Sequence, residues 1–125
     1  MAQAVSWQKV EGALVFGAGL ALYAVQAEGM PVWLALLAFF APDLSFAGYL
    51  AGPRLGAIVY NSVHLYGFGA GVLALGALFG APLLLECGAL WLAHSGFDRM
   101  LGYGLKLPEA FTATHLGPIG PARRG

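Results

Sequence analysis

An uncharged stretch from Leu55 to Leu85 constrains the fold of this chain more than any other feature. A hydrocarbon core of ~30 Å needs about 20 predominantly apolar residues, so a run of this length is typical of a transmembrane helix. Hydrophobic residues make up 59% of the 125 residues and charged residues 10%, against roughly 45–50% and 25% in soluble domains. The mean hydropathy is +0.75. We therefore expect an integral membrane protein, and the net charge of zero gives no basic field for nucleic acid.

Proline and glycine divide the apolar sequence into four candidate spans. Proline favours the first turn of a helix and glycine the position just past its end, and such residues lie at 29–31, 52–53 and 80–82. We predict spans at about 11–27, 31–51, 55–79 and 82–101, with a tail over 102–125. The predicted fold is all-α: a single-domain, four-helix transmembrane bundle with a partly ordered C-terminal segment. Glycines 67, 69 and 71 in the third span suit close helix packing, which predicts a homo-oligomer or a partner membrane helix within the lipid bilayer.

All six lysines and arginines fall on one side of this four-span arrangement. They are Lys9, Arg54, Arg99, Lys106, Arg123 and Arg124. Cytoplasmic loops of membrane proteins carry an excess of Lys and Arg, so that side is predicted to be the cytoplasm, with both termini in it.

The few polar residues inside the spans are expected to meet at one depth. Asp43 lies 11 residues before Arg54 and His64 lies 10 residues after it, so both would be ~15 Å from that turn. His94 and Asp98 are spaced i, i+4 and share a helix face. We predict that these four side chains line one cytoplasm-facing cavity. Because an unpaired buried charge is costly, Arg54 or Arg99 should pair with one of the carboxylates.

Two imidazoles and two carboxylates form a ligand set that zinc or iron takes. We interpret Asp43, His64, His94 and Asp98 as candidate catalytic groups, and His64, His94 and Asp98 as candidate metal ligands. No metalloprotease string such as HExxH is present, so the pattern is not specific. A buried hydrogen-bonded network that holds the spans in register remains an alternative. A metal-free acid–base site or proton path is another.

Further polar residues would border the same site. Cationic side chains at the predicted cytoplasmic side could bind an anionic head group. The predicted substrate-binding residues are Arg54, Asn61, Arg99, Tyr103, Lys106 and His115. In the tail, Pro108 could start a short helix, and a capping segment would bring His115 to the mouth of the site.

Three strings carry a family resemblance: APDLSFAGYLAGPRLGAIVYNSVH, WLAHSGFDRMLGYGLK and FTATHLGPIG. They resemble the bacterial domain-of-unknown-function family 4260, over Glu11 to about Gly120. The resemblance implies a small multi-span protein of the bacterial inner membrane and carries no established activity.

Two hypotheses about function follow. In the first, the chain is a metal-dependent membrane hydrolase that acts on a lipid or other amphiphile, with a metal-bound water as nucleophile and Asp43 or Asp98 as base when not a ligand. The alternative is a non-enzymatic membrane binding, transport or assembly subunit, in which the polar residues are structural or form a proton path.

Overall fold

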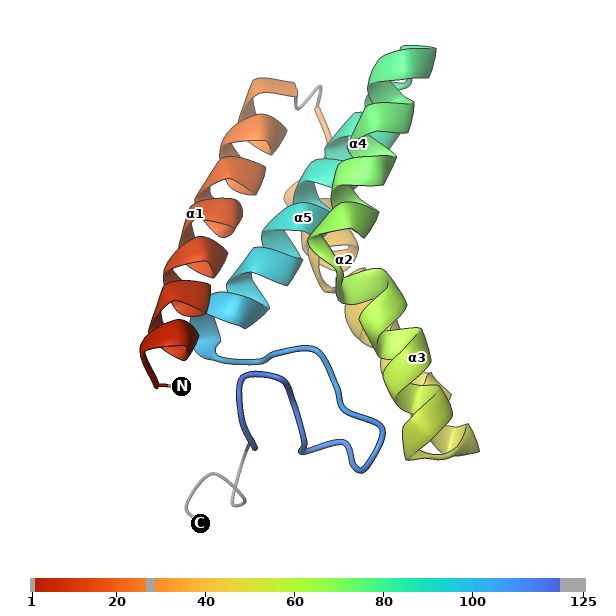
Figure 1. The fold of residues 1–125 in the computed structure, drawn as a ribbon. Coiled ribbons are helices and arrows are strands. Elements are labelled where there is room, and N and C mark those ends of the chain that lie inside the picture. Colours follow the sequence, from red (N-terminus) through yellow and green to blue (C-terminus); the bar gives the residue numbers. More distant parts are fainter. Residues whose placement is uncertain (1, 27–28, 120–125) are drawn as a thin grey trace.

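The protein is all-α in the computed structural model, which describes residues 2–26 and 29–119 (Figure 1). Over these residues there are five α-helices, one 3-10 helix and no strand. The elements are α1 (Ala2–Gln26), α2 (Val32–Phe40), the 3-10 helix η1 (Ala41–Ala51), α3 (Pro53–His64), α4 (Tyr66–Phe79) and α5 (Pro82–Leu101). The all-α prediction is confirmed, although two of the four predicted spans are each divided into two elements.

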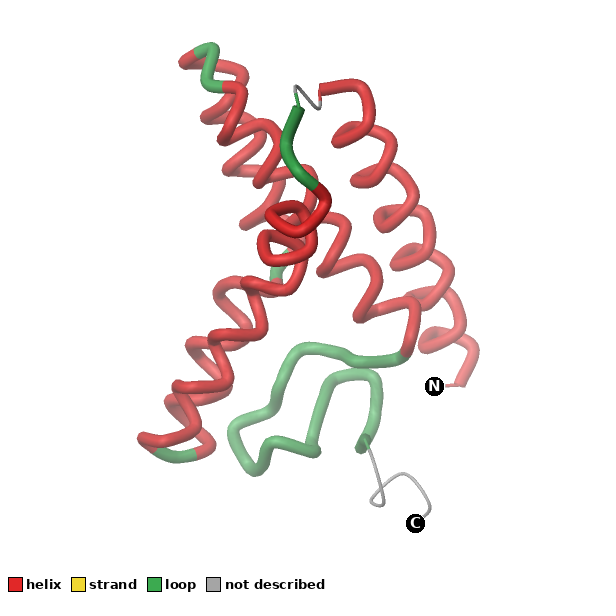
Figure 2. Tube along the Cα trace, turned by 180° about the vertical axis from the view of Figure 1, so that it is seen from behind, coloured by secondary structure: helices red, strands yellow, loops and turns green. Residues whose placement is uncertain are grey.

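The chain runs up and down between two ends of the molecule. Figures 1 and 2 show the start of α1, the turn at the start of α3 and the tail at one end, and the turn between α4 and α5 at the other. Helix α5 is central, because it contacts α1, α4 and α2, while η1 packs on α3. Helix α1 begins at Ala2, well before the predicted start of the first span at residue 11.

Close packing between α1 and α5 depends on glycines that face the other helix. A Cβ atom built on Gly12 would lie 2.5 Å from the backbone nitrogen of Met100, and one on Gly96 would lie 2.4 Å from that of Phe16. Gly19 meets the backbone of Ala93 in the same way, at 2.7 Å. These contacts hold the backbones of α1 and α5 close together, as small residues do where helices pack in lipid.

The segment predicted as the second span changes helix type at its middle. Helix α2 ends at Phe40, and η1 continues with 3-10 geometry to Ala51. Pro42 lies in the first turn of η1, where its missing N–H costs least, and Asp43 follows it. A 3-10 run longer than three or four residues is uncommon and often marks a functional or strained segment.

The segment predicted as a single third span, residues 55–79, is two helices. Helices α3 and α4 meet at an angle of 45°, and Leu65 between them has extended backbone angles (φ −69°, ψ 142°). Two carbonyl groups next to this break accept hydrogen bonds from α5: Trp91 Nε1 donates to Val63 at 2.7 Å, and Arg99 Nη2 donates to His64 at 3.2 Å. The side chains of α5 therefore satisfy backbone groups that the break would leave without partners.

Among the described residues, few helices are long and apolar enough to cross a membrane. By length and composition the segment Val32–Ala51 meets that criterion, and α3 with α4 meets it when the bent pair counts as one span. Only 6% of the Val32–Ala51 window is buried inside the protein, so its large apolar side chains, including Trp33, Leu37 and Leu44, lie on the outside. The four-span arrangement and the orientation of the termini stay predictions.

The described tail, residues 102–119, folds back under the ends of α3 and α5 (Figure 1). Its two arms pair through Leu107 N to Ala113 O at 2.8 Å and His115 N to Leu105 O at 3.0 Å. Asn61 on α3 bonds both backbone groups of Lys106, at 2.6 and 2.8 Å. The prediction of a short helix that starts at Pro108 is wrong, because residues 108–109 form a turn between these two arms.

Candidate metal centre

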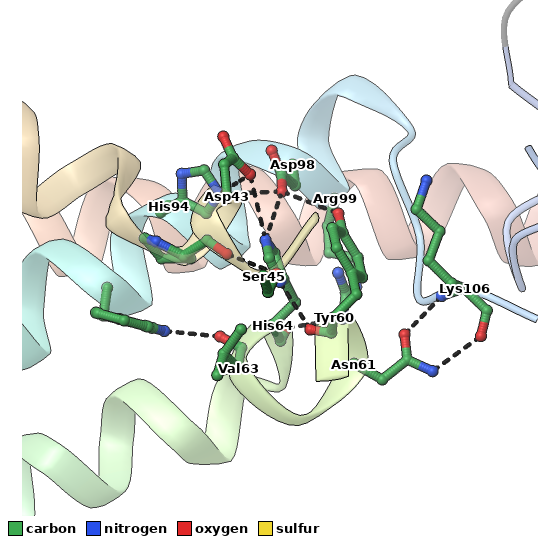
Figure 3. Close-up of polar contacts among 12 residues, drawn as sticks. Asp43, Ser45, Tyr60, Asn61, Val63, His64, His94, Asp98, Arg99 and Lys106 are labelled. Carbon is green, nitrogen blue, oxygen red and sulfur yellow. Dashed lines mark hydrogen bonds and ion pairs between the residues drawn. The ribbon is translucent and has the colours of Figure 1, made fainter. Parts of the chain in front are cut away.

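Four ionisable side chains from three elements gather at the middle of the fold (Figure 3). Asp43 comes from η1, His64 is the last residue of α3, and His94 and Asp98 lie one turn apart on α5. Each offers one ligand atom, and the four atoms all lie within 4.8 Å of one another. We call these four residues the His/Asp cluster. Both histidines and Asp98 are buried, whereas the Asp43 side chain is 34% exposed.

Four distances inside the His/Asp cluster are close to the spacing of ligands around one ion. His64 Nε2 lies 3.5 Å from Asp43 Oδ1 and 3.6 Å from Asp98 Oδ2, and His94 Nε2 lies 3.2 Å from each of these oxygens. Zinc bonds to nitrogen and oxygen measure ~2.0–2.2 Å, so ligands at the corners of a tetrahedron are roughly 3.3–3.6 Å apart. The four residues thus have the chemical identity of ligands for a divalent metal, and four of the distances between their ligand atoms are close to those around such an ion.

The tautomer of His64 adds a second argument. Its Nδ1 lies 2.8 Å from the carbonyl oxygen of Tyr60, one turn earlier in α3, so Nδ1 carries hydrogen and donates. In the neutral ring, Nε2 then presents a lone pair to two carboxylate oxygens and makes no hydrogen bond among the described residues. His94 Nε2 also lies 3.2 Å from both of these oxygens, and Tyr60 Oη donates to that of Asp98 at 3.4 Å. The lone pair of His64 still faces two negatively charged oxygens, which favours a positive ion, either a proton or a metal, between them. A histidine held through its other nitrogen by a carbonyl is the usual arrangement for a metal ligand.

Aromatic rings fix the two imidazoles and limit the access of water. The Tyr60 ring stacks on His64 with centroids 3.7 Å apart and planes 9° from parallel. Phe39 and Phe40 contact His94 edge-on, at 5.2 and 6.1 Å. These rings make the surroundings of the imidazoles apolar, which strengthens electrostatic interactions inside the cluster.

The predicted pairing of an arginine with a carboxylate is wrong. Within the described residues, every ion pair with an aspartate of the cluster involves a histidine. Arg99 is buried and donates to the carbonyl of His64, with its guanidinium 5.3 Å from the centre of the Tyr66 ring. Adjacent residues on a helix do not share a face, so Arg99 turns away from the cluster that Asp98 joins. Arg54 lines a second cavity, which Lys106 also borders.

A cavity of about 470 Å³ reaches the His/Asp cluster from the side of the tail. It brings together the two carboxylates, a lysine, aromatic rings and residues of the tail. Its lining consists of Asp43, Phe46, Tyr60, Asp98, Tyr103, Lys106, Phe111, Thr112 and Ile119. The two carboxylates of the cluster line this cavity as predicted, whereas the two histidines are buried behind its lining. Ligand sites commonly have volumes of about 300–1,000 Å³. The cavity is therefore large enough for a small ligand beside the cluster.

Lys106 is the cationic residue of this cavity. It is buried, and its Nζ lies 3.8 Å from the centre of the Phe111 ring and 5.1 Å from that of Tyr60. Burial lowers the pKa of Lys106, while the negative charge of Asp98 opposes this shift. Among the described residues, no carboxylate lies within ion-pair distance of Nζ.

The other predicted substrate-binding residues lie in different surroundings. Tyr103 lines the cavity. The side-chain amide of Asn61 instead bonds the backbone of Lys106, with Nδ2 donating to the carbonyl and Oδ1 accepting from the N–H. His115 is outside the cavity lining, and its Nδ1 accepts a hydrogen bond from the Leu105 N–H at 2.8 Å. Partial burial, and then the positive charge of Arg99, lower the pKa of His115.

Several lining residues were not predicted from the sequence. Phe46 had a readable signal, because it follows Asp43 by three residues and i, i+3 neighbours lie on one side of a 3-10 helix. Phe111 and Ile119 had none, because the path of the tail brings them to the cavity.

Comparison with known proteins agrees with the resemblance noted above. No curated protein and no solved structure gives a significant match to the chain. The family model described as "Domain of unknown function (DUF4260)" matches residues 5–119, which include the His/Asp cluster, the helix break and the folded tail. The chain therefore belongs to the DUF4260 family.

Proposed function

We propose that this chain is an integral membrane protein whose His/Asp cluster binds a divalent metal, zinc or iron, and uses it to hydrolyse an amphiphile. The observation that carries the proposal is the His64 lone pair, which faces two carboxylate oxygens at 3.5 and 3.6 Å inside a set of four ligand atoms that lie within 4.8 Å of one another. A structural hydrogen-bonded network would place a donor between these acceptors, and the fixed Nδ1–H of His64 leaves none on that ring unless it is charged.

A membrane location is supported by the outward-facing apolar segment Val32–Ala51 and by the bent pair α3 and α4. In this proposal the chain crosses a bacterial inner membrane four times, with both termini in the cytoplasm and the lysines and arginines on that side. Helices α1 and α5 are less apolar, and they would cross as partners packed against each other and against α4. Apolar residues left exposed on the outer faces would contact lipid, a second copy of the chain or a partner helix.

The chemistry follows from the access to the cluster. Asp43 is the most exposed of the four ligands and lines the cavity, so it is the ligand best placed to exchange with water. A metal lowers the pKa of bound water and polarises an ester or phosphoryl oxygen, and a displaced Asp43 would accept the proton of that water. Asp98 and the two histidines would stay on the ion. The cavity would hold the substrate against this face.

A second function is supported by one observation. The cluster offers four protein ligands, enough to fill a tetrahedral coordination sphere, and closed sites of this kind are usually structural. In that case the metal would hold η1, α3 and α5 together in a non-enzymatic membrane subunit. Metal-dependent turnover separates the two functions, because a structural ion gives stability without hydrolysis.

Metal analysis of the full chain tests the proposal. We expect one divalent ion per chain after purification in a mild detergent without chelators, measured by inorganic mass spectrometry. His64→Ala and His94→Ala should lose the ion, and His115→Ala is the matched control because His115 lies outside the cluster. Circular dichroism and gel filtration identify variants that fail to fold. A folded wild-type chain that holds no metal, and takes up none when zinc or iron is added, contradicts the proposal.

A hydrolase assay follows on the same samples. The metal-loaded chain should release product from short-chain esters or phosphoesters, lose this activity on chelation and regain it when the metal is returned. Metal binding without turnover on any of them favours the structural function.

A further inference from the structure

We propose that the 470 Å³ cavity binds the phosphate group of a lipid-like amphiphile between Lys106 and the metal-loaded His/Asp cluster, an inference that rests on the function proposed above. It names the class of substrate, which the cluster alone does not specify.

The first support comes from the burial and the contacts of Lys106. This residue is 4% exposed, lines the cavity and has no carboxylate within ion-pair distance among the described residues. Figure 3 shows its side chain extending away from Asn61, which holds only its backbone. The ammonium group contacts the faces of Phe111 and Tyr60 at the cavity, and an anionic ligand there would give it a partner of opposite charge.

The second support is the balance of charge around the cavity. Asp43 and Asp98 also line it, so without a metal the two carboxylates would repel an anion. A divalent ion cancels both carboxylate charges and leaves the positive charge of Lys106 unopposed. Anion binding should therefore depend on the metal.

The chemistry of the lining favours phosphate and an apolar chain. Besides the lysine and the metal, the hydroxyl-bearing residues Tyr103 and Thr112 border the cavity, which suits an oxyanion with several oxygens. Phe46, Phe111 and Ile119 form apolar walls beside them. A ligand with a phosphate at one end and a hydrocarbon at the other would satisfy both parts of the lining.

The test measures binding to the full chain in a neutral detergent by titration calorimetry, with zinc-loaded and zinc-free protein. The probes are dihexanoylphosphatidate, dihexanoylphosphatidylcholine and inorganic phosphate. We expect phosphatidate to bind in a saturable, zinc-dependent manner, and more tightly than either of the other two. Loss of a hydrogen bond to a charged group should weaken this binding about tenfold or more in Lys106→Met. Lys106→Arg keeps the charge and should retain most of the affinity.

Arg54→Met is the matched control, because it removes a cation that does not line this cavity. Zinc content should be unchanged in all three variants. Zinc-loaded Lys106→Met with wild-type affinity, or equal binding by the zinc-free wild type, overturns the inference. Equal affinity for inorganic phosphate overturns the assignment of an amphiphile and identifies free phosphate as the ligand of the cavity.

The outcomes separate the two proposals. If the chain binds zinc but not phosphatidate, the inference about substrate fails and the metal site stands. If the chain takes up no metal, the proposed function fails, and this inference fails with it.

Discussion

The packing of α1 on α5 gives a quantitative prediction about the scaffold of the cluster. In Gly96→Ala the new methyl group would lie 2.4 Å from the backbone nitrogen of Phe16 and 2.7 Å from the carbonyl oxygen of Gly12. Both are backbone atoms of α1, so no side chain can rotate away, and the two helices must separate. Gly17→Ala in α1 is the matched control, because nothing lies within 4 Å of its added methyl group.

The expected magnitude follows from the difference between these two substitutions. Replacing a glycine inside a helix by alanine stabilises the helix by roughly 0.5–1 kcal/mol, and this gain is common to both variants. Forcing extra volume into a packed contact costs about 1–3 kcal/mol. We therefore expect Gly96→Ala to be less stable than Gly17→Ala by about 1–3 kcal/mol. Because His94 lies two residues before Gly96, the separation should also weaken zinc binding in Gly96→Ala alone.

Equilibrium unfolding of both variants in one detergent, followed by circular dichroism, measures this difference. Titration with zinc on the same samples measures the effect on the site. If Gly96→Ala is as stable as Gly17→Ala, the close approach of α1 and α5 is wrong. The position of His94 and Asp98 relative to η1 and α3 would then lose its support.

Three further predictions concern the break, the tail and the topology. Arg99→Met leaves the buried His64 carbonyl without its donor, so we expect a loss of about 1–3 kcal/mol in the free energy of unfolding; wild-type stability would show that the break does not depend on Arg99. The pKa of His115 is lowered in the folded chain, so the unfolded chain binds a proton at this imidazole more readily. The contribution of His115 to stability is therefore fully present above about pH 6.5 and is lost as the pH falls below that value. His115→Gln should therefore flatten the pH dependence of unfolding in that range, and an unchanged slope contradicts the assignment. Reporter fusions after Gly29 and after Gly80 should behave as external and a fusion after Arg54 as cytoplasmic, and a cytoplasmic reporter at Gly80 would exclude the four-span arrangement.

The sequence could predict that the four cluster residues lie close together, because their positions depend on the regular rise and periodicity of helices. His94 and Asp98 are one helical turn apart, and Asp43 and His64 lie at similar distances from the turn that joins their segments. Asp43 and His64 meet in the structure although one segment is a 3-10 helix, which rises by about 2.0 Å per residue, and the other ends at His64. Their roles as ligands or catalytic groups stay predictions.

The helix break was not accessible from the sequence. Neither Leu65 nor its neighbours His64 and Tyr66 is glycine or proline, so no local signal marks the site. The donors that stabilise it, Trp91 and Arg99, come from a helix far along the chain. The sequence predicts that Arg54 or Arg99 pairs with a carboxylate, because a buried charge needs compensation. In the structure, the partner of Arg99 at the break is the backbone carbonyl of His64.

The role of Arg99 connects the break to the charge of the cluster. The carbonyl end of α3 carries partial negative charge, and the guanidinium of Arg99 lies against it, so this cation is compensated without either carboxylate. Asp98 accepts a hydrogen bond from Tyr60 Oη at 3.4 Å, and among the described residues the ion-pair partners of Asp43 and Asp98 are the two histidines. One of those histidines already donates its Nδ1 hydrogen elsewhere. An arginine paired with Asp98 would have neutralised part of the site and weakened its attraction for a divalent ion. The turn of α5 from His94 to Arg99 thus contributes two of the four groups that could hold a metal and directs the nearby cation to the helix break, so that Arg99 neutralises neither carboxylate.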